Sequence, residues 1–190
     1  MSLSPRSVRR PLAVAAALAL GGSASAAIVA VFPAVVAVVP ANVRLNQTQS
    51  DTRLIAFDER QCFALPFDLP TDHGKIPAHT WMSSHFIHGD PVTQLLLDGR
   101  VRFDNLILGV ISTSAGLDAT DVPCGRPGVT YPVPGAEPNR GLEPPPQADA
   151  YAIVDAGRGI AVRMEIPTAS YTDQIRVLTC CGDACPAPQM

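Results

Sequence analysis

Prolines and glycines interrupt this chain so often that few stretches remain in which a long regular helix could form. Its 190 residues include 19 prolines and 14 glycines. Proline lacks a backbone N–H and breaks helices, and both residues are typical of turns. The pattern therefore predicts short β-strands joined by turns.

The segments between these breaks have the composition or the alternation of β-strands. Residues 160–166 alternate apolar and more polar side chains, which predicts a strand with one buried face, and residues 151–155 lie on the other side of a Gly-containing turn. Asp98-Gly99 separates two further β-prone runs and predicts a type I′ hairpin. Apolar residues of both parities in 106–111 predict a strand that is covered on both faces.

Further β-prone segments cover much of the remaining chain, and helical patterns are scarce. Residues 115–121 predict one helical turn at most. We therefore expect an all-β fold, an antiparallel β-sandwich of the jelly-roll kind. Its other predicted strands are residues 28–32, 35–39, 52–57, 61–65, 78–88 and 174–179.

The N-terminus has the order of features that a secretory signal peptide requires. Three arginines precede an uncharged apolar run, which ends in the small residues Ala24-Ser25-Ala26. We expect residues 1–26 to be removed and the mature protein to be secreted, periplasmic or bound at the cell surface. No charged residue occurs from Pro11 to Val39, so an uncleaved membrane anchor is the alternative.

The mature chain is predicted to be one sandwich domain over residues 27–179, followed by a Cys-rich tail over 180–190. Within the domain, residues 123–148 are rich in proline and predict a long loop. Loss of residues 1–26 removes three arginines from a chain whose formal net charge is already −3. A lysine-poor, acidic surface argues against nucleic-acid partners. Stable membrane insertion is not expected once the signal peptide is cleaved.

Five cysteines fit an oxidising compartment. They are Cys62, Cys124, Cys180, Cys181 and Cys185. In an exported protein such residues usually form disulfides, and an odd number leaves one of them over. The spacing of the last three lacks the two-residue gap that is usual in zinc knuckles, so disulfides are favoured over a metal site. The pairing stays open.

The order of several strand and turn segments resembles a group of exported bacterial domains found in proteins that carry the PEP-CTERM surface-sorting signal. The resembling segments are 54–61, 84–86, 103–111, 128–132, 140–143 and 173–179. The resemblance implies a β-sandwich of unassigned activity, so it transfers no functional residues. The sorting tail of such proteins is absent after Thr179, where the Cys-rich ending stands instead.

One predicted strand carries the candidate ligand-binding residues His79, Trp81 and His85. If Met82 and Phe86 face the core, these three side chains point outward together. An exposed indole among polar groups can stack on a sugar ring, which predicts a glycan or another cell-surface component as a partner. The alternative is that the only Trp of the chain packs in the core.

Aspartates beside turns suggest calcium as a possible cofactor. Loop oxygens bind calcium, and Asp118 with Asp121 is the closest local pair, although Asp173 and other aspartates also flank turns. No segment matches a known calcium-binding repeat, and aspartate is also simply a good turn residue. No other cofactor is indicated.

Catalytic residues are not evident. The chain contains no Gly-x-Ser-x-Gly and no His-Glu-x-x-His segment. We therefore expect a non-catalytic exported module with a structural or surface-recognition role. An exported hydrolase with a site near His85 and a carbohydrate-binding module that uses Trp81 are the alternatives.

Overall fold

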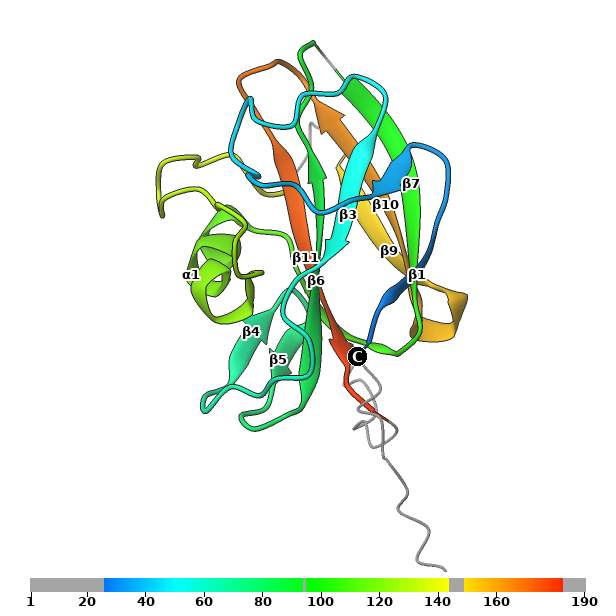
Figure 1. Cartoon of the computed structure of the whole chain (residues 1–190), viewed down its shortest axis with the longest axis vertical. Coiled ribbons are helices and arrows are strands. Elements are labelled where there is room, and N and C mark those ends of the chain that lie inside the picture. Colours follow the sequence, from blue (N-terminus) through cyan, green and yellow to red (C-terminus); the bar gives the residue numbers. More distant parts are fainter. Residues whose placement is uncertain (1–25, 94, 144–148, 183–190) are drawn as a thin grey trace, which may run out of the picture.

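Two β-sheets packed face to face form the body of the protein (Figure 1). The computed structural model describes residues 26–93, 95–143 and 149–182. The first sheet has four strands, in the order β1 (Ile28–Val31), β7 (Leu95–Phe103), β10 (Gly159–Ile166) and β9 (Ala150–Val154). The second sheet has five strands, in the order β2 (Val35–Ala37), β3 (Leu54–Asp58), β6 (Met82–Gly89), β11 (Asp173–Cys180) and β8 (Ile107–Ile111). The predicted all-β sandwich is confirmed.

The strands are antiparallel with one exception, the parallel pair of β2 and β3. The N-terminal chain therefore contributes to both sheets, because β1 pairs with β7 of the four-stranded sheet before β2 joins the other. The end of the uncharged run, from Ile28 onward, thus supplies an edge strand to each sheet. The predicted signal peptide lies almost wholly outside the described residues, and none of the described helices is long and apolar enough to cross a membrane.

The core between the sheets follows the alternation that was predicted for residues 160–166. Ile160, Val162, Met164 and Ile166 of β10 are buried, whereas the side chains between them are more exposed. They pack against apolar residues of the five-stranded sheet, among them Leu54, Ile87 and Val177. The predicted hairpin is confirmed as β9 and β10, joined through a short 3-10 turn at Asp155–Gly157.

A third layer covers the outer face of the five-stranded sheet. It consists of helix α1 (Ser114–Cys124) and the small hairpin of β4 (Leu69–Thr71) and β5 (Gly74–Ile76), on the side away from β7 and β10 (Figure 1). A second apolar cluster lies beneath this layer and includes Phe57, Phe86, Leu117 and Leu178. Because of it, all eight residues of β6 and all eight of β11 are buried.

The predicted hairpin at Asp98-Gly99 is wrong. Both residues lie within the continuous strand β7, where they pair with Arg163 and Val162 of β10. A Cβ atom on Gly99 would come within 2.4 Å of the Val35 side chain. This glycine therefore permits close packing between the sheets rather than a tight turn.

Helix α1 is longer than the single turn that the sequence predicted. The hydroxyl of Thr113 caps its start by accepting a hydrogen bond from the Gly116 N–H, 3.2 Å away. Leu117 and Thr120 are buried against the sheet, and Pro123 lies in the last turn. The predicted loop over 123–148 therefore begins two residues later than expected, since residues 123 and 124 end α1; residues 125–143 form no helix or strand, and residues 144–148 lie outside the described residues.

The described cysteines follow the prediction of disulfides. Cys62 is bonded to Cys181, with the two Cα atoms 5.3 Å apart, and Cys180 is also disulfide-bonded. Among the described cysteines, Cys124 is free and buried. Cys185 lies outside the described residues. The Cys62–Cys181 bond joins the loop after β3 to the end of β11.

Candidate functional site

His85 lies in the centre of a hydrogen-bonded chain that runs across the five-stranded sheet. Its Nδ1 is 2.7 Å from Oδ1 of Asp58 on β3, and its Nε2 is 2.8 Å from Oγ1 of Thr179 on β11. The neighbouring strands bring these residues together because β6 pairs with both β3 and β11. An acid, a histidine and a hydroxyl in this order are the components of a nucleophilic triad.

This arrangement has no accessible nucleophile. His85 and Thr179 are completely buried, and the histidine ring packs against Phe103, with ring centroids 4.5 Å apart. A catalytic hydroxyl must contact its substrate. The chain of hydrogen bonds instead satisfies polar groups inside the sandwich, and Asp58 also accepts a hydrogen bond from the backbone N–H of Ile28 on β1. The geometry does not support a hydrolase site at His85.

The three predicted ligand-binding residues do not share a surface. Trp81 precedes β6 and is 61% exposed, so the indole lies outside the core as the binding hypothesis required. His79 is also exposed, but His85 points into the space between the sheets. The outward orientation predicted for His85 is wrong because both faces of β6 are covered. Trp81 remains an exposed aromatic side chain beside the Cys62–Cys181 disulfide, since its carbonyl accepts a hydrogen bond from the Cys181 N–H.

Asp118 and Asp121, the predicted calcium pair, bind arginines in the structure. Arg140 contacts Oδ1 of Asp118 at 2.9 Å and Oδ2 of Asp121 at 2.6 Å. Arg176 contacts the second oxygen of Asp121 at 3.0 Å and also forms a bidentate ion pair with Glu59, at 2.7 and 2.8 Å. Guanidinium groups therefore neutralise the carboxylates that the sequence offered to a metal. Both arginines lie far from Asp118 and Asp121 in the sequence, so the spacing of neighbouring residues could not predict these ion pairs.

Cys124, the free cysteine, has no properties of a catalytic thiol. It is fully buried in the second apolar cluster. Burial raises the pKa of its thiol to about 12, so that the thiol stays protonated at neutral pH. The thiolate is the reactive form, and its absence makes this cysteine a packing residue.

An apolar groove lies where the edges of the two sheets meet, and its volume is about 680 Å³. One wall is β8 with the residue that precedes it, and the other wall is β9. Its apolar lining includes Leu106, Ile107, Leu108, Val110, Ile153 and Val154. This volume is within the range of about 300–1,000 Å³ that is common for ligand sites.

Tyr151 adds a hydrogen-bonding group to the lining of this groove. Its hydroxyl donates a hydrogen bond to Oδ2 of Asp72 at 2.9 Å and lies 3.0 Å from Nε2 of His73. Burial and the adjacent Asp72 carboxylate raise the pKa of the Tyr151 hydroxyl, which therefore remains protonated. These contacts join β9 to the turn between β4 and β5 and hold one end of the groove in place.

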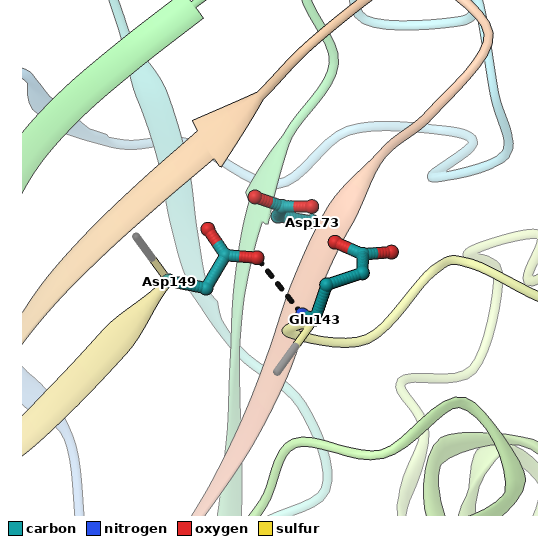
Figure 2. Close-up of side chains that lie close together, drawn as sticks. All are labelled: Glu143, Asp149 and Asp173. Atoms are coloured by element: carbon teal, nitrogen blue, oxygen red, sulfur yellow. Dashed lines mark hydrogen bonds between the residues drawn. The ribbon is translucent and has the colours of Figure 1, made fainter. Parts of the chain in front are cut away.

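Three carboxyl groups from separate segments form the candidate cation site. They belong to Glu143, Asp149 and Asp173, and each contributes one oxygen to a set that lies within 4.8 Å of one another. Figure 2 shows the three groups gathered around a common space between β9 and β11. Burial and the neighbouring carboxylates raise the pKa of Asp173 to about 9, and burial with Asp149 raises that of Glu143 to about 7.

The sequence pointed to only one member of this cluster. Asp173 was among the aspartates beside turns, whereas Glu143 and Asp149 carried no signal. The three residues are separated by up to 30 positions and meet only through the packing of the two sheets. A spacing rule for loop ligands could not have found them.

Comparisons of the chain with protein-family models, curated proteins and solved structures give no match. The resemblance to domains of PEP-CTERM proteins therefore stays a prediction. The groove, the carboxyl cluster and the exposed Trp81 are the features of this chain that bear on its function.

Proposed function

We propose that this protein is an exported, non-catalytic β-sandwich module that recognises an extended polypeptide segment along the groove between β8 and β9. The observation that carries the proposal is the open edge of β9 beside an apolar groove. The Cys62–Cys181 disulfide supports an oxidising location, because such bonds persist mainly outside the cytosol.

The edge of β9 lacks the features that normally prevent strands from pairing with other chains. Its residues Ala150–Val154 include no charge and no proline, and within the described residues only β10 pairs with it. Natural sheets usually protect such edges with lysine, proline or a bulge. At about 3.3 Å per residue, this edge offers roughly 17 Å of backbone to an added strand.

The groove complements this edge chemically. An added strand would form main-chain hydrogen bonds with β9, and every second side chain would point toward the apolar wall that β8 forms. Ile153 is 39% exposed, which leaves apolar surface on β9 for such contacts. A sugar chain would leave these aliphatic groups without matching partners, so the lining favours a polypeptide with apolar side chains.

Selection from a random dodecapeptide library displayed on phage tests the proposal. Ile153→Lys would place a charge on the open edge, and Val122→Lys would place the same charge on α1, where Val122 is 91% exposed. We expect selection on the wild-type protein to enrich peptides with alternating apolar residues. Their affinity should decrease at least tenfold for Ile153→Lys and remain unchanged for Val122→Lys.

Two results would contradict recognition at the groove. One is the failure of any peptide to enrich on the folded protein, and the other is equal binding of the enriched peptides to both lysine variants. Circular dichroism spectra of the two variants check that each retains the β-fold before binding is compared.

Carbohydrate binding at Trp81 is the second candidate function, and the exposure of the indole is the observation that favours it. His79 is the nearby predicted partner, whereas buried His85 cannot reach a ligand there. A glycan array that is probed with the wild-type protein and with Trp81→Ala distinguishes the candidates. Signals that disappear in Trp81→Ala but persist in Ile153→Lys would favour the glycan.

A further inference from the structure

We propose that Glu143, Asp149 and Asp173 bind a calcium ion that joins the two sheets. This inference does not depend on the proposed peptide groove, because none of the three residues lines it. The site differs from the predicted pair Asp118 and Asp121, whose oxygens contact arginines.

No lysine, arginine or histidine of the described residues neutralises the cluster. Among the described residues, Glu143, Asp149 and Asp173 form no ion pair with lysine, arginine or histidine. Three carboxyl groups at this separation repel one another when they are ionised. Either protons or a bound cation must relieve that repulsion.

Asp173 provides an independent indication of a missing partner. Its side chain is completely buried, and within the part of the chain that the structure describes no N–H or hydroxyl donates to Oδ1 or Oδ2, which face only the carboxyl groups of Asp149 and Glu143. One oxygen of Glu143 is also buried, and none of the described N–H or hydroxyl groups donates a hydrogen bond to it. Buried polar atoms are nearly always satisfied, and an orphaned carboxylate that faces two other carboxylates is suited to a cation.

The geometry agrees with calcium. Two oxygens that bind one ion from opposite sides can be separated by twice the metal–oxygen distance, about 5 Å for calcium and about 4.2 Å for magnesium. The three oxygens lie within 4.8 Å of one another, so all of them can reach one calcium ion. Three carboxylates can supply up to six oxygens when all bind in the bidentate mode, and water can complete the 6–8 ligands that calcium takes.

Backbone hydrogen bonds hold Asp149 in the orientation that such a site needs. Its Oδ2 accepts from the Glu143 N–H at 2.9 Å, and its Oδ1 accepts from the Glu165 N–H at 2.6 Å. Each carboxylate oxygen has a second lone pair, so these bonds leave Asp149 able to bind a metal. The first bond also holds the backbone of Glu143 next to Asp149.

The position of the cluster gives the ion a structural role. Asp173 begins β11 of the five-stranded sheet, Asp149 immediately precedes β9 of the four-stranded sheet, and Glu143 belongs to the segment after α1 (Figure 2). A bound ion would therefore link three segments that otherwise approach one another with like charges. A ligand that binds only the folded state raises the melting temperature.

Calorimetric titration and thermal unfolding of the full-length, disulfide-bonded protein test this site. After treatment with EDTA and removal of the chelator, the protein is titrated with calcium chloride and, separately, with magnesium chloride. We expect one calcium per chain and a rise in melting temperature of roughly 5–10 °C at calcium 100-fold above the dissociation constant. We expect at least a tenfold weaker response to magnesium.

Two variants of the cluster and one control locate the binding. Asp173→Asn and Glu143→Gln retain side-chain shape and should each weaken calcium binding at least tenfold. Asp98→Asn removes an exposed carboxylate on β7 and should leave calcium binding unchanged. Glu143 is only partly buried, so its variant provides a test even if Asp173→Asn fails to fold.

Three results would overturn the proposal. The first is the absence of binding heat and of a thermal shift at 10 mM calcium. The second is equal calcium binding by wild type and Glu143→Gln. The third is an equal response to magnesium and calcium, which would exclude the calcium assignment. A calcium-insensitive wild type together with a more stable Asp173→Asn would show that the cluster shares protons instead.

Discussion

Removal of the Cys62–Cys181 disulfide should destabilise the fold strongly. The bonded residues are separated by 119 positions, so the bond closes a loop that contains most of the described protein. In the chain-entropy description, a loop of this length lowers the entropy of the unfolded state enough to stabilise the fold by about 5 kcal/mol. Replacing both cysteines by serine should lower the free energy of unfolding by about that amount.

The assay is urea unfolding at neutral pH without reductant, followed by far-UV circular dichroism. Tryptophan fluorescence is a poor probe because Trp81 is 61% exposed in the folded protein and its surroundings change little on unfolding. The single variants Cys62→Ser and Cys181→Ser should each lose as much stability as the double variant, because either change breaks the same bond.

A loss below about 1 kcal/mol in the double variant would refute the reasoning. It would mean that the unfolded chain is already restricted, so that closing the loop removes little additional entropy. A loss of about 5 kcal/mol would be a large part of the 5–15 kcal/mol that is typical of whole domains. The fold would then depend on oxidation, which is the condition that export provides.

Two further predictions concern the buried side chains of Arg176 and His88. Arg176→Met should lower the free energy of unfolding by about 3–5 kcal/mol in urea, because it leaves Glu59 buried without its ion pair. Adding Glu59→Gln should restore much of this loss. A double variant as unstable as Arg176→Met alone would contradict the prediction. Burial lowers the pKa of His88 to about 4, below its unfolded value of 6.5, so the unfolded state binds the proton first. Stability should therefore fall by about 3 kcal/mol between pH 6.5 and 4 relative to His88→Gln, and parallel pH profiles of the two proteins would refute it.

The sequence predicted those parts of the fold in which one face of a strand is buried and the other is not. β10 showed this alternation clearly, and its hairpin with β9 followed from the turn between them. Residues 78–88 and 174–179 were also predicted as strands and correspond to β6 and β11, but the burial of both their faces was not predicted, because α1 and the β4–β5 hairpin cover the second face. For the same reason, the outward position expected for His85 was wrong.

The turn predicted from a local dipeptide was wrong at a position where packing between the sheets also requires glycine. Asp98-Gly99 has the sequence of a type I′ turn, yet Gly99 lies in the middle of β7 because Val35 of the facing sheet leaves no room for a side chain. A hairpin signal and a close-packing signal are identical at the level of one dipeptide. Only the position of β2, which lies more than 60 residues earlier in the chain, distinguishes them.

The two acidic groups of this protein show why candidate metal ligands cannot be ranked by local sequence. Asp118 and Asp121 are neighbours on one helix, which made them the obvious pair, but Arg140 and Arg176 already neutralise them. Glu143, Asp149 and Asp173 are not neighbours in the sequence, and none of the described arginines forms an ion pair with them. Whether a cluster of carboxylates is neutralised thus depends on which arginine, lysine or histidine side chains the fold places beside it. A cluster that receives none must hold protons or an external ion, so the lack of an arginine beside Asp173 is more informative than the number of aspartates around it.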